Sequence, residues 1–304
     1  MKNELIYNFP WESVPRAWYE HVIREFLDWG IDRFVFTFPL ALECLRAPEC
    51  ITFLHSLEKK LGAHFLSMHG LCGRGFDMNT LDPARRPGMI ADHIRCMEIA
   101  HEFGAQTYTI HPGASHYTRH EAKLPELRKL GAETMRELVP AAERIGIVLA
   151  VENSFEPTNA ACEVLALIEP YLGNPAVGVC YDTGHAHCKA YTPGKDPAKY
   201  HGSVIRSWYE TGVIFENALE VLKPHVVTCH MHDNTGYGDL HGLPGDGTLN
   251  WAALLPELHT CPRMLEWQTE IDYSDGENWA GKLLAPPGGY SIKRIVEGFR
   301  KLGF

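Results

Sequence analysis

Residues 177–185 read VGVCYDTGH, and this segment contains the pattern that decides the fold. A run of small and β-branched apolar residues ends in Asp182, and His185 follows three residues later. A short, continuous apolar run is typical of a strand that is buried on both faces of a parallel sheet. The segment therefore predicts a buried strand with an acid and a histidine at its carboxyl end.

Similar short apolar runs recur along the chain, and each is followed by a polar loop and a longer amphipathic stretch with helical spacing. The predicted strands are Leu5–Phe9, Arg33–Phe38, His64–His69, Gln106–His111, Ile147–Glu152, Val177–Asp182, Val226–His230 and Arg263–Trp267. Gly62 and Gly146 stand just before two of these strands, where a glycine favours the end of a helix. Eight such units favour a closed (β/α)8 TIM barrel, an α/β fold, over an open doubly wound sheet, and no Gly-x-Gly-x-x-Gly phosphate loop follows the first strand.

The composition fits one barrel domain over residues 1–304, since 45% of the residues are hydrophobic and 22% are charged. A formal charge of −10 disfavours nucleic acid as a partner, because the chain as a whole has no basic footprint for phosphate groups. The nine cysteines contain no Cys-x-x-Cys pair, which indicates reduced thiols. Neither a signal-peptide core nor a membrane span is visible in the sequence. We therefore expect a cytoplasmic protein without a membrane partner, and a homo-oligomer is compatible with this class of barrel.

Ionisable side chains mark the carboxyl ends of the third to eighth predicted strands, which carry His69, His111, Glu152, Asp182, His230 and Glu266. His185 follows the sixth strand, and the loop after the seventh adds Asp239 and His241. In a parallel barrel these strand ends surround one mouth, where barrel enzymes keep their active sites. Carboxylates about 5 Å apart repel by roughly 3 kcal/mol per pair at an effective dielectric constant near 20, so such a site needs a cation. Imidazole and carboxylate ligands without cysteine favour manganese or zinc.

Two of these assignments have alternatives in the sequence. His232 shares strand parity with His230, and Glu270 shares it with Glu266, so either member of each pair can point towards the mouth. We favour His230 and Glu266 as the metal ligands, with His232 and Glu270 as the alternatives.

These segments resemble the xylose isomerase-like TIM barrel superfamily, which includes sugar phosphate isomerases and epimerases and the AP endonuclease family 2 enzymes of the endonuclease IV type. The matching segments are His69-Gly70, Thr109–Gly113, Val151–Asn153, Tyr181–His185, His230–Asn234, Asp239–His241, Pro244–Gly247 and Leu265–Glu266. They extend over most of the chain, and the Asp-Thr-Gly-His and His-x-His-Asp-Asn segments are the most specific of them.

The resemblance implies a divalent metal cofactor in either branch of the superfamily. In the endonuclease branch it implies a centre of three ions, with ligands at His69, His111, Glu152, Asp182, His185, His230, Asp239, His241 and Glu266. In the epimerase branch it implies one ion, held by residues matching Glu152, Asp182, His230 and Glu266. The resemblance therefore leaves one to three ions open.

Two departures from the endonuclease pattern favour the sugar branch. Gly184 stands where the endonucleases usually have cysteine, and residues 230–235 read HMHDNT where they have His-x-Asn-Asp followed by serine and lysine. We therefore expect a metal-dependent sugar isomerase or epimerase that moves a proton through a metal-stabilised enediolate.

In this reaction Glu152 and Glu266 are the expected base and conjugate acid, or serve as ligands only. His185, His69 and His111 are candidates for contacts to the hydroxyl groups of a small sugar substrate, and the phosphorylation state of that substrate stays open. The alternatives are an endonuclease IV-type phosphodiesterase, a lyase or deglycosylase that acts on an oxidised sugar, and a sugar-binding protein without turnover.

Overall fold

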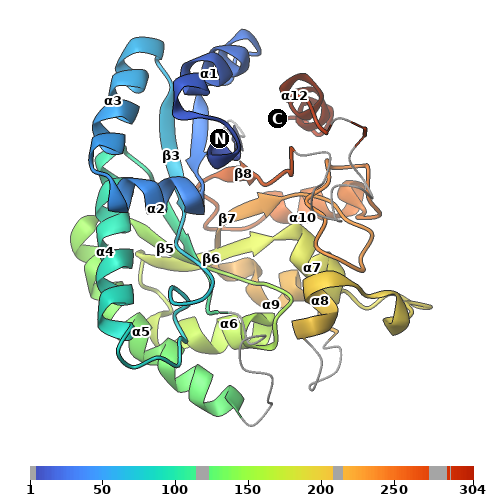
Figure 1. Cartoon of the computed structure of the whole chain (residues 1–304). Coiled ribbons are helices and arrows are strands. Elements are labelled where there is room, and N and C mark those ends of the chain that lie inside the picture. Colours follow the sequence, from blue (N-terminus) through green and yellow to red (C-terminus); the bar gives the residue numbers. More distant parts are fainter. Residues whose placement is uncertain (1–4, 114–122, 208–214, 274–285, 288) are drawn as a thin grey trace.

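Eight parallel strands form a nearly closed barrel in the computed structural model of the chain (Figure 1). The structure describes residues 5–113, 123–207, 215–273, 286–287 and 289–304. The strands are β1 (Leu5–Ile6), β2 (Arg33–Phe36), β3 (His64–His69), β4 (Thr107–Ile110), β5 (Val148–Glu152), β6 (Val177–Asp182), β7 (Val226–Met231) and β8 (Trp267–Thr269). Neighbours along the chain pair in parallel from β2 to β8, and β8 pairs with β1. A parallel bridge between Tyr7 and Phe34 joins β1 to β2, which confirms the predicted (β/α)8 barrel.

Helices fill the connections between the strands and surround the barrel. They are α1 (Tyr19–Asp28), α2 (Phe38–Arg46), α3 (Glu49–Leu61), α4 (Arg86–Glu102), α5 (Leu124–Ile145), α6 (Ala161–Ile168), α7 (Thr183–Lys189), α8 (Gly202–Ser207), α9 (Ala218–Leu222), α10 (Trp251–His259) and α12 (Ile292–Lys301). Gly62 and Gly146 end α3 and α5 in the left-handed conformation, with φ of 70° and 86°. Among the described residues, no helix has the length and apolar character that a membrane span requires.

The largest difference from the predicted strands concerns the eighth. The sequence predicts a strand over Arg263–Trp267, but residues 262–263 form a turn after α10 and the paired strand is Trp267–Thr269. The pairing that fixes this register joins His230 to Gln268 and Met231 to Thr269. Glu266 therefore precedes β8, whereas Glu270 follows it at the carboxyl end.

β3 and β6 have the predicted bounds, and the remaining strands differ from the prediction at their ends. The predicted first strand, Leu5–Phe9, is paired in a ladder only over Leu5–Ile6, and the second ends at Phe36 because Phe38 and Pro39 begin α2. β7 extends one residue further than predicted, to Met231.

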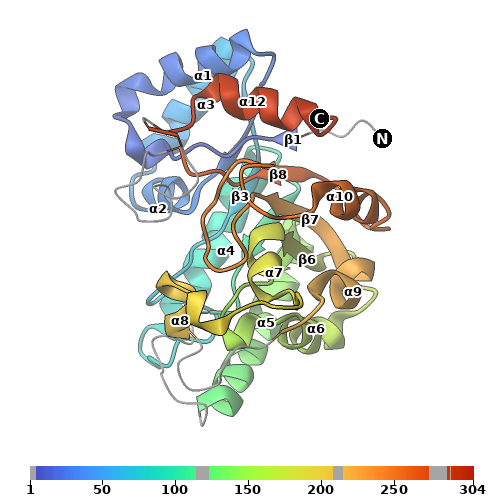
Figure 2. The same cartoon turned by 90° about the vertical axis from the view of Figure 1, so that its right-hand side faces the viewer.

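The apolar core lies between the strands and the helices, and aromatic rings dominate it near the chain start. Trp11, Phe26, Phe34 and Phe65 are fully buried, and the Trp11 indole donates a hydrogen bond of 3.2 Å to the carbonyl of Val35. Full burial of one such side chain contributes about 1.5–3 kcal/mol. At the carboxyl end of the barrel, α7, α8 and the loop after β7 lie on one side of the molecule, which faces the viewer in Figure 2.

Candidate metal-binding active site

The strand register brings ionisable side chains together at the carboxyl ends of neighbouring strands. Glu152 pairs with Cys180 on β6, Asp182 pairs with His230 on β7, and His230 pairs with Gln268 on β8. Glu152 and Asp182 are fully buried and His230 is 2% exposed. The carboxyl end of the barrel thus gathers charged and titratable groups away from water.

Glu152 lies at the centre of this arrangement. Its Oε2 atom lies 3.0 Å from Nε2 of His111, 3.3 Å from Nδ1 of His230 and 3.9 Å from Nε2 of His69. Its Oε1 atom lies 3.3 Å from Nδ1 of His185. Neither oxygen has a partner with hydrogen-bond geometry among the described residues. Four imidazoles therefore surround one buried carboxylate without satisfying it.

Five overlapping groups of described side chains converge closely enough to hold a metal ion, each with its ligand atoms within 4.8 Å of one another. Three of them, numbered below, contain every histidine and carboxylate of the five, and the other two recombine these residues, one of them with Cys180. Group 1 comprises His69, His111 and Glu152, group 2 comprises Glu152, Asp182, His230 and Glu270, and group 3 comprises His185, His232, Asp239 and His241. Groups 1 and 2 share Glu152, which has two oxygens and can serve both. Of the nine metal ligands suggested by the sequence, all except Glu266 fall into these groups.

The unsatisfied atoms in these groups fit a divalent metal. Within the three numbered groups, the buried atoms without a hydrogen-bond partner among the described residues are His111 Nε2, both Glu152 oxygens, His230 Nδ1, His232 Nδ1, Asp239 Oδ1 and Glu270 Oε2. An unpaired polar group costs about 1–3 kcal/mol, and a charged one more. Borderline ions such as zinc and manganese prefer this imidazole and carboxylate donor set, so the residues present fit such an ion.

Three histidines are oriented by backbone carbonyls in the way that metal ligands require. His69, His185 and His241 donate from Nδ1 to the carbonyls of Gly70, Asn153 and Glu270, at 3.0, 3.1 and 2.9 Å. A carbonyl only accepts hydrogen bonds, so in the neutral form of each ring the proton lies on Nδ1 and the Nε2 lone pair is the one available to a metal. Nε2 of His241 lies 3.1 Å from Oδ1 of Asp239, and Nε2 of His185 lies 3.5 Å from Oδ2 of Asp239.

Metal binding at pH 7 is expected to release at least two protons per loaded chain. Burial opposes protonation of His111, but the charge of Glu152 outweighs it and raises the pKa of His111 to about 9. Burial likewise opposes protonation of His241, and Asp239 raises its pKa to about 10. A metal takes only neutral imidazole, so these protons must leave, and affinity should rise with pH up to those pKa values.

Calorimetric titration of metal into the metal-free protein, in buffers of different ionisation enthalpy, measures this release. An apparent enthalpy that does not depend on the buffer would contradict it.

The two glutamates near β8 lie in different surroundings. Oε2 of Glu270 lies 3.0 Å from Nδ1 of His230, and the charge of His230 outweighs burial and holds the pKa of Glu270 well below its usual range. Glu266 lies outside the three metal-binding groups, and burial raises its pKa to about 7. The register of β8 explains why the two glutamates differ, because it places Glu270 rather than Glu266 at the carboxyl end of the strand.

His232, the second alternative, also lies in the site. Its Nε2 atom donates to the Asp182 carboxylate, at 3.1 and 3.0 Å from the two oxygens, and its ring stacks on that of His241 at 4.1 Å. Gly184 makes room for this ring, since a Cβ at position 184 would lie 2.0 Å from Cε1 of His232. Gly184 and His232, which both depart from the endonuclease pattern, therefore lie against each other. His232 also links group 2 to group 3, because it contacts both Asp182 and His241.

The Gly184→Ala substitution is expected to destabilise the protein by roughly 1–3 kcal/mol, because the added methyl group displaces His232 from Asp182. In the His232→Asn background the same substitution should cost less, since the smaller side chain leaves space. Denaturant unfolding of the wild type, both single variants and the double variant measures the coupling, expected at about 0.5–3 kcal/mol. Additive effects would show that the two positions are independent.

The loop after β7 carries Asp239 and His241, and sequence reasoning missed the residue that organises it. The fully buried Asp233 carboxylate accepts hydrogen bonds from the backbone amides of Asn234, Gly245 and Leu249 and from the indole of Trp251. His241 has a φ of 46°, an uncommon conformation outside glycine that occurs often at functional sites. The sequence signal for this role was the position of Asp233 within the His-x-His-Asp-Asn segment.

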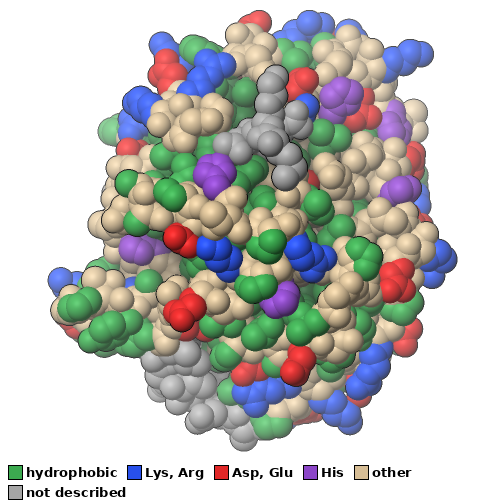
Figure 3. Space-filling view, turned by 180° about the vertical axis from the view of Figure 1, so that it is seen from behind, with side chains coloured by type: hydrophobic (Ala, Val, Ile, Leu, Met, Phe, Trp, Pro, Cys, Tyr) green, Lys and Arg blue, Asp and Glu red, His purple; other side chains and the backbone are tan. Residues whose placement is uncertain are grey.

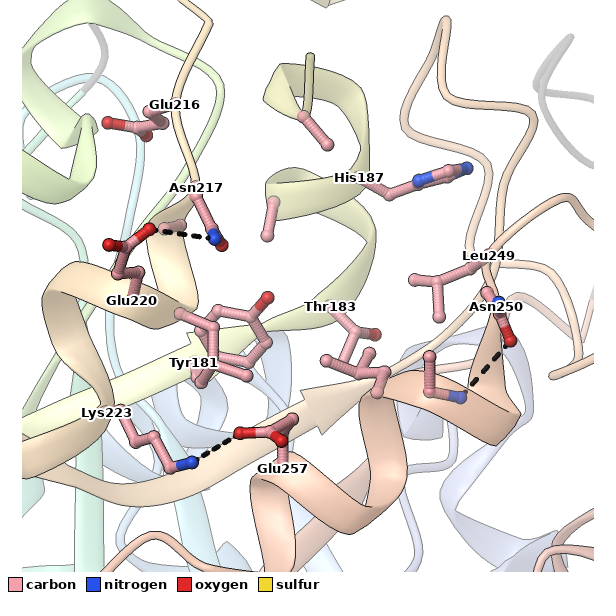
Figure 4. A pocket seen from close by; sticks show the side chains of 16 residues that line it. Tyr181, Thr183, His187, Glu216, Asn217, Glu220, Lys223, Leu249, Asn250 and Glu257 are labelled. Carbon is pink, nitrogen blue, oxygen red and sulfur yellow. Dashed lines mark hydrogen bonds and ion pairs between the residues drawn. The ribbon is translucent and has the colours of Figure 1, made fainter. Parts of the chain in front are cut away.

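A separate cavity of about 600 Å³ lies outside the strands, between α7, α9 and α10 (Figure 4). Tyr181 and Thr183 line it, and the Lys223–Glu257 ion pair of 2.5 Å lies at its edge. It contains no member of groups 1 to 3. Asp182 faces the barrel interior whereas the neighbouring Tyr181 faces this cavity, as the alternation of strand side chains requires.

Comparison with known proteins supports the same fold. A family model described as "Xylose isomerase-like TIM barrel" matches residues 31–283. The chain is 27% identical over 170 residues to the uncharacterized protein MJ1311 of Methanocaldococcus jannaschii, covering 53% of this chain and 49% of that protein. The chain thus spans about half the length of this curated relative.

Two solved structures resemble the chain over nearly its whole length. The 3-keto-D-glucoside 4-epimerase YcjR from E. coli superposes with a TM-score of 0.68 at 16% identity, covering 99% of both chains. A D-psicose 3-epimerase from Clostridium cellulolyticum, crystallised with D-tagatose, gives a TM-score of 0.67 at 14% identity, covering 99% of this chain and 96% of that one. At this identity the likeness concerns the fold, while the family model covers most of the sequence. The chain belongs to the xylose isomerase-like TIM barrel family.

Proposed function

We propose that the protein is a metal-dependent isomerase or epimerase of a small sugar that carries a carbonyl group. The observation that carries this proposal is group 2, in which Glu152 and Glu270 approach His230 from two non-adjacent strands. The resemblance to the epimerase branch implies one ion held by two glutamates, an aspartate and a histidine, and in this proposal Glu270 rather than Glu266 is the second glutamate. The sugar epimerases among the structural neighbours support the same class of substrate.

A divalent ion in group 2 would polarise a carbonyl and its neighbouring hydroxyl, which makes the adjacent C–H acidic. The protein then needs one carboxylate to take the proton and a second acid to return it. Glu152 and Glu270 fit these two roles because each has a buried oxygen without a hydrogen-bond partner among the described residues. His69 and His185, both at most 8% exposed, are suited to hold hydroxyl groups or further ions.

The experiment that tests this proposal is hydrogen exchange at the substrate. Ketoses, aldoses and keto-glucosides are incubated with the manganese- or zinc-loaded protein in D2O, and NMR follows deuterium uptake at the carbon next to the carbonyl. We expect uptake and epimer formation for at least one sugar, and neither in the Glu152→Gln and Glu270→Gln variants. Elimination products from an oxidised sugar would indicate a lyase or deglycosylase instead.

A second candidate function is a phosphodiesterase of the endonuclease type, and the presence of three groups rather than one favours it. Such an enzyme uses several ions to stabilise the attacking and leaving oxygens, and it needs a basic surface that holds the nucleic acid backbone. The formal charge of −10 argues against such a surface. On the face in Figure 3, basic side chains lie scattered among acidic and hydrophobic ones. Cleavage of an abasic-site oligonucleotide, without exchange in any sugar, would overturn the sugar proposal.

A further inference from the structure

A layer of buried polar side chains lies inside the barrel, towards the amino ends of the strands from the metal-binding groups. It comprises Ser67 on β3, Thr107 on β4, Thr228 on β7, Glu266 just before β8 and Gln268 on β8. All five side chains are at most 3% exposed. Barrel interiors are usually filled by branched apolar residues, so a polar layer at this depth requires a reason.

The hydrogen bonds of this layer converge on one oxygen of Glu266. Thr107 donates to Oε1 at 2.5 Å, Gln268 donates to it at 2.9 Å, and Thr228 approaches it at 3.5 Å. Gln268 also donates to the Thr228 hydroxyl at 2.9 Å, and Ser67 completes the chain at 3.1 Å from the Thr107 hydroxyl. We call these five residues the Glu266 network. It connects four strands of the barrel.

The second oxygen of Glu266 has no such partners. Oε2 is buried without a hydrogen bond among the described residues. No lysine or arginine of the described chain forms an ion pair with this carboxyl group. Burial raises the pKa of Glu266 to about 7, and the hydrogen bonds of the network oppose this only in part. The Glu266 carboxyl group thus accepts hydrogen bonds from neutral donors at Oε1, and these hold it in place without a cation.

The spacing of the network matches that of the metal-binding side chains. His69 lies two residues beyond Ser67, His230 two beyond Thr228, and Glu270 two beyond Gln268. His111 lies four beyond Thr107. Strand residues two apart face the same side, so His69 and His230 share the inward faces of β3 and β7 with Ser67 and Thr228. His111 and Glu270 directly follow the ends of β4 and β8. Any slip between these strands would change the spacing of those four side chains.

We propose that Glu266 is a positioning residue rather than a metal ligand, and that its network holds β3, β4, β7 and β8 at the relative height that lets His69, His111, His230 and Glu270 bind metal. This inference rests on the proposed function only in taking those four side chains as metal-binding. Removal of hydrogen-bonded groups behind metal ligands lowers metal affinity by about 10- to 100-fold in other proteins.

The test compares Glu266→Gln, Glu266→Ala, Thr107→Val and Glu270→Gln by metal affinity without sugar. A glutamine keeps an accepting oxygen at the Oε1 position, so Glu266→Gln should bind the same number of ions with affinity within about 3-fold of the wild type. Glu266→Ala and Thr107→Val should bind roughly 10- to 100-fold more weakly. Glu270→Gln should lose the ion of group 2. Thr107→Val keeps the shape of the side chain and serves as the second probe if the alanine variant does not fold.

Visible absorption of the cobalt-substituted protein reports the ligand geometry, which a merely structural role would leave unchanged. We expect an altered cobalt spectrum in Thr107→Val and a spectrum restored to the wild type in Glu266→Gln. Loss of an ion in Glu266→Gln but not in Glu270→Gln would overturn the inference and make Glu266 the ligand. Unchanged affinity in both Glu266→Ala and Thr107→Val would also overturn it. A wild type that binds metal but turns over no sugar would instead sink the proposed function alone.

Discussion

Replacing Glu152 with glutamine is expected to reduce turnover sharply and to remove metal from groups 1 and 2 together. The residue belongs to both groups, and its Oε2 atom lies within 3.3 Å of nitrogens from both His111 and His230. An amide oxygen is a much weaker ligand than a carboxylate and cannot act as a base at neutral pH. Loss of about 4 kcal/mol of transition-state stabilisation corresponds to roughly a 10³-fold fall in kcat/KM.

The same substitution should destabilise the metal-free protein. Burial and the charges of His111 and His230 act in opposite directions on Glu152, and the histidines hold its pKa well below the usual range. Removing one partner of a buried charge pair leaves the other uncompensated, at a cost of about 3–5 kcal/mol. The control is Glu257→Gln on the exposed surface of α10, where only an ion pair with Lys223 is lost. Retained metal and turnover in Glu152→Gln would contradict the central role of this residue.

Metal removal is the second large effect that we expect. Chelation should eliminate turnover and lower the melting temperature, because the buried atoms of the three groups lose the cation that compensates them. An ion present at about 1,000 times its Kd stabilises the folded state by roughly 4 kcal/mol. For a chain of this size that corresponds to a fall in Tm on the order of 8 °C.

Scanning calorimetry with and without chelator measures this shift, and manganese or zinc should reverse it. The Glu152→Gln variant provides the control, since it should respond much less to the chelator. A wild type with the same Tm in both conditions, while metal is bound in one of them, would show that the ions do not compensate these groups.

The barrel could be predicted because its strands follow a simple pattern of apolar runs, and most of these runs carry an ionisable residue at or near their carboxyl end. The eighth strand begins later in the structure than the sequence predicts. Met264, Leu265 and Trp267 look like a strand in sequence, but the chain still turns after α10 at residues 262–263. Only the pairing of His230 with Gln268 fixes where the strand begins. A pairing register depends on contacts with distant residues and leaves no trace in the local sequence.

The candidate site was predictable to the extent that strand ends define it. His69, His111, Glu152 and Asp182 follow directly from their strands, and the structure brings them close together. The choice between Glu266 and Glu270 needed the register, and both fit the alternation of side chains equally well.

The loop after β7 needed long-range information of another kind. Its shape depends on hydrogen bonds from Gly245, Leu249 and Trp251 to Asp233, which bring together residues up to 18 positions apart. His232 also depends on a contact that sequence alone does not reveal, because the space for its ring exists only where Gly184 lacks a side chain. Residue types therefore indicated the chemistry, while tertiary contacts decided which atoms meet.

The most direct test of the account is elemental analysis of the purified protein after dialysis against manganese and zinc and removal of loosely bound ions. We predict between one and three ions per chain in the wild type, and a loss in Glu152→Gln of the ions that groups 1 and 2 hold. A correctly folded wild type that retains no metal would contradict the claim that Glu152 organises a metal-dependent active site.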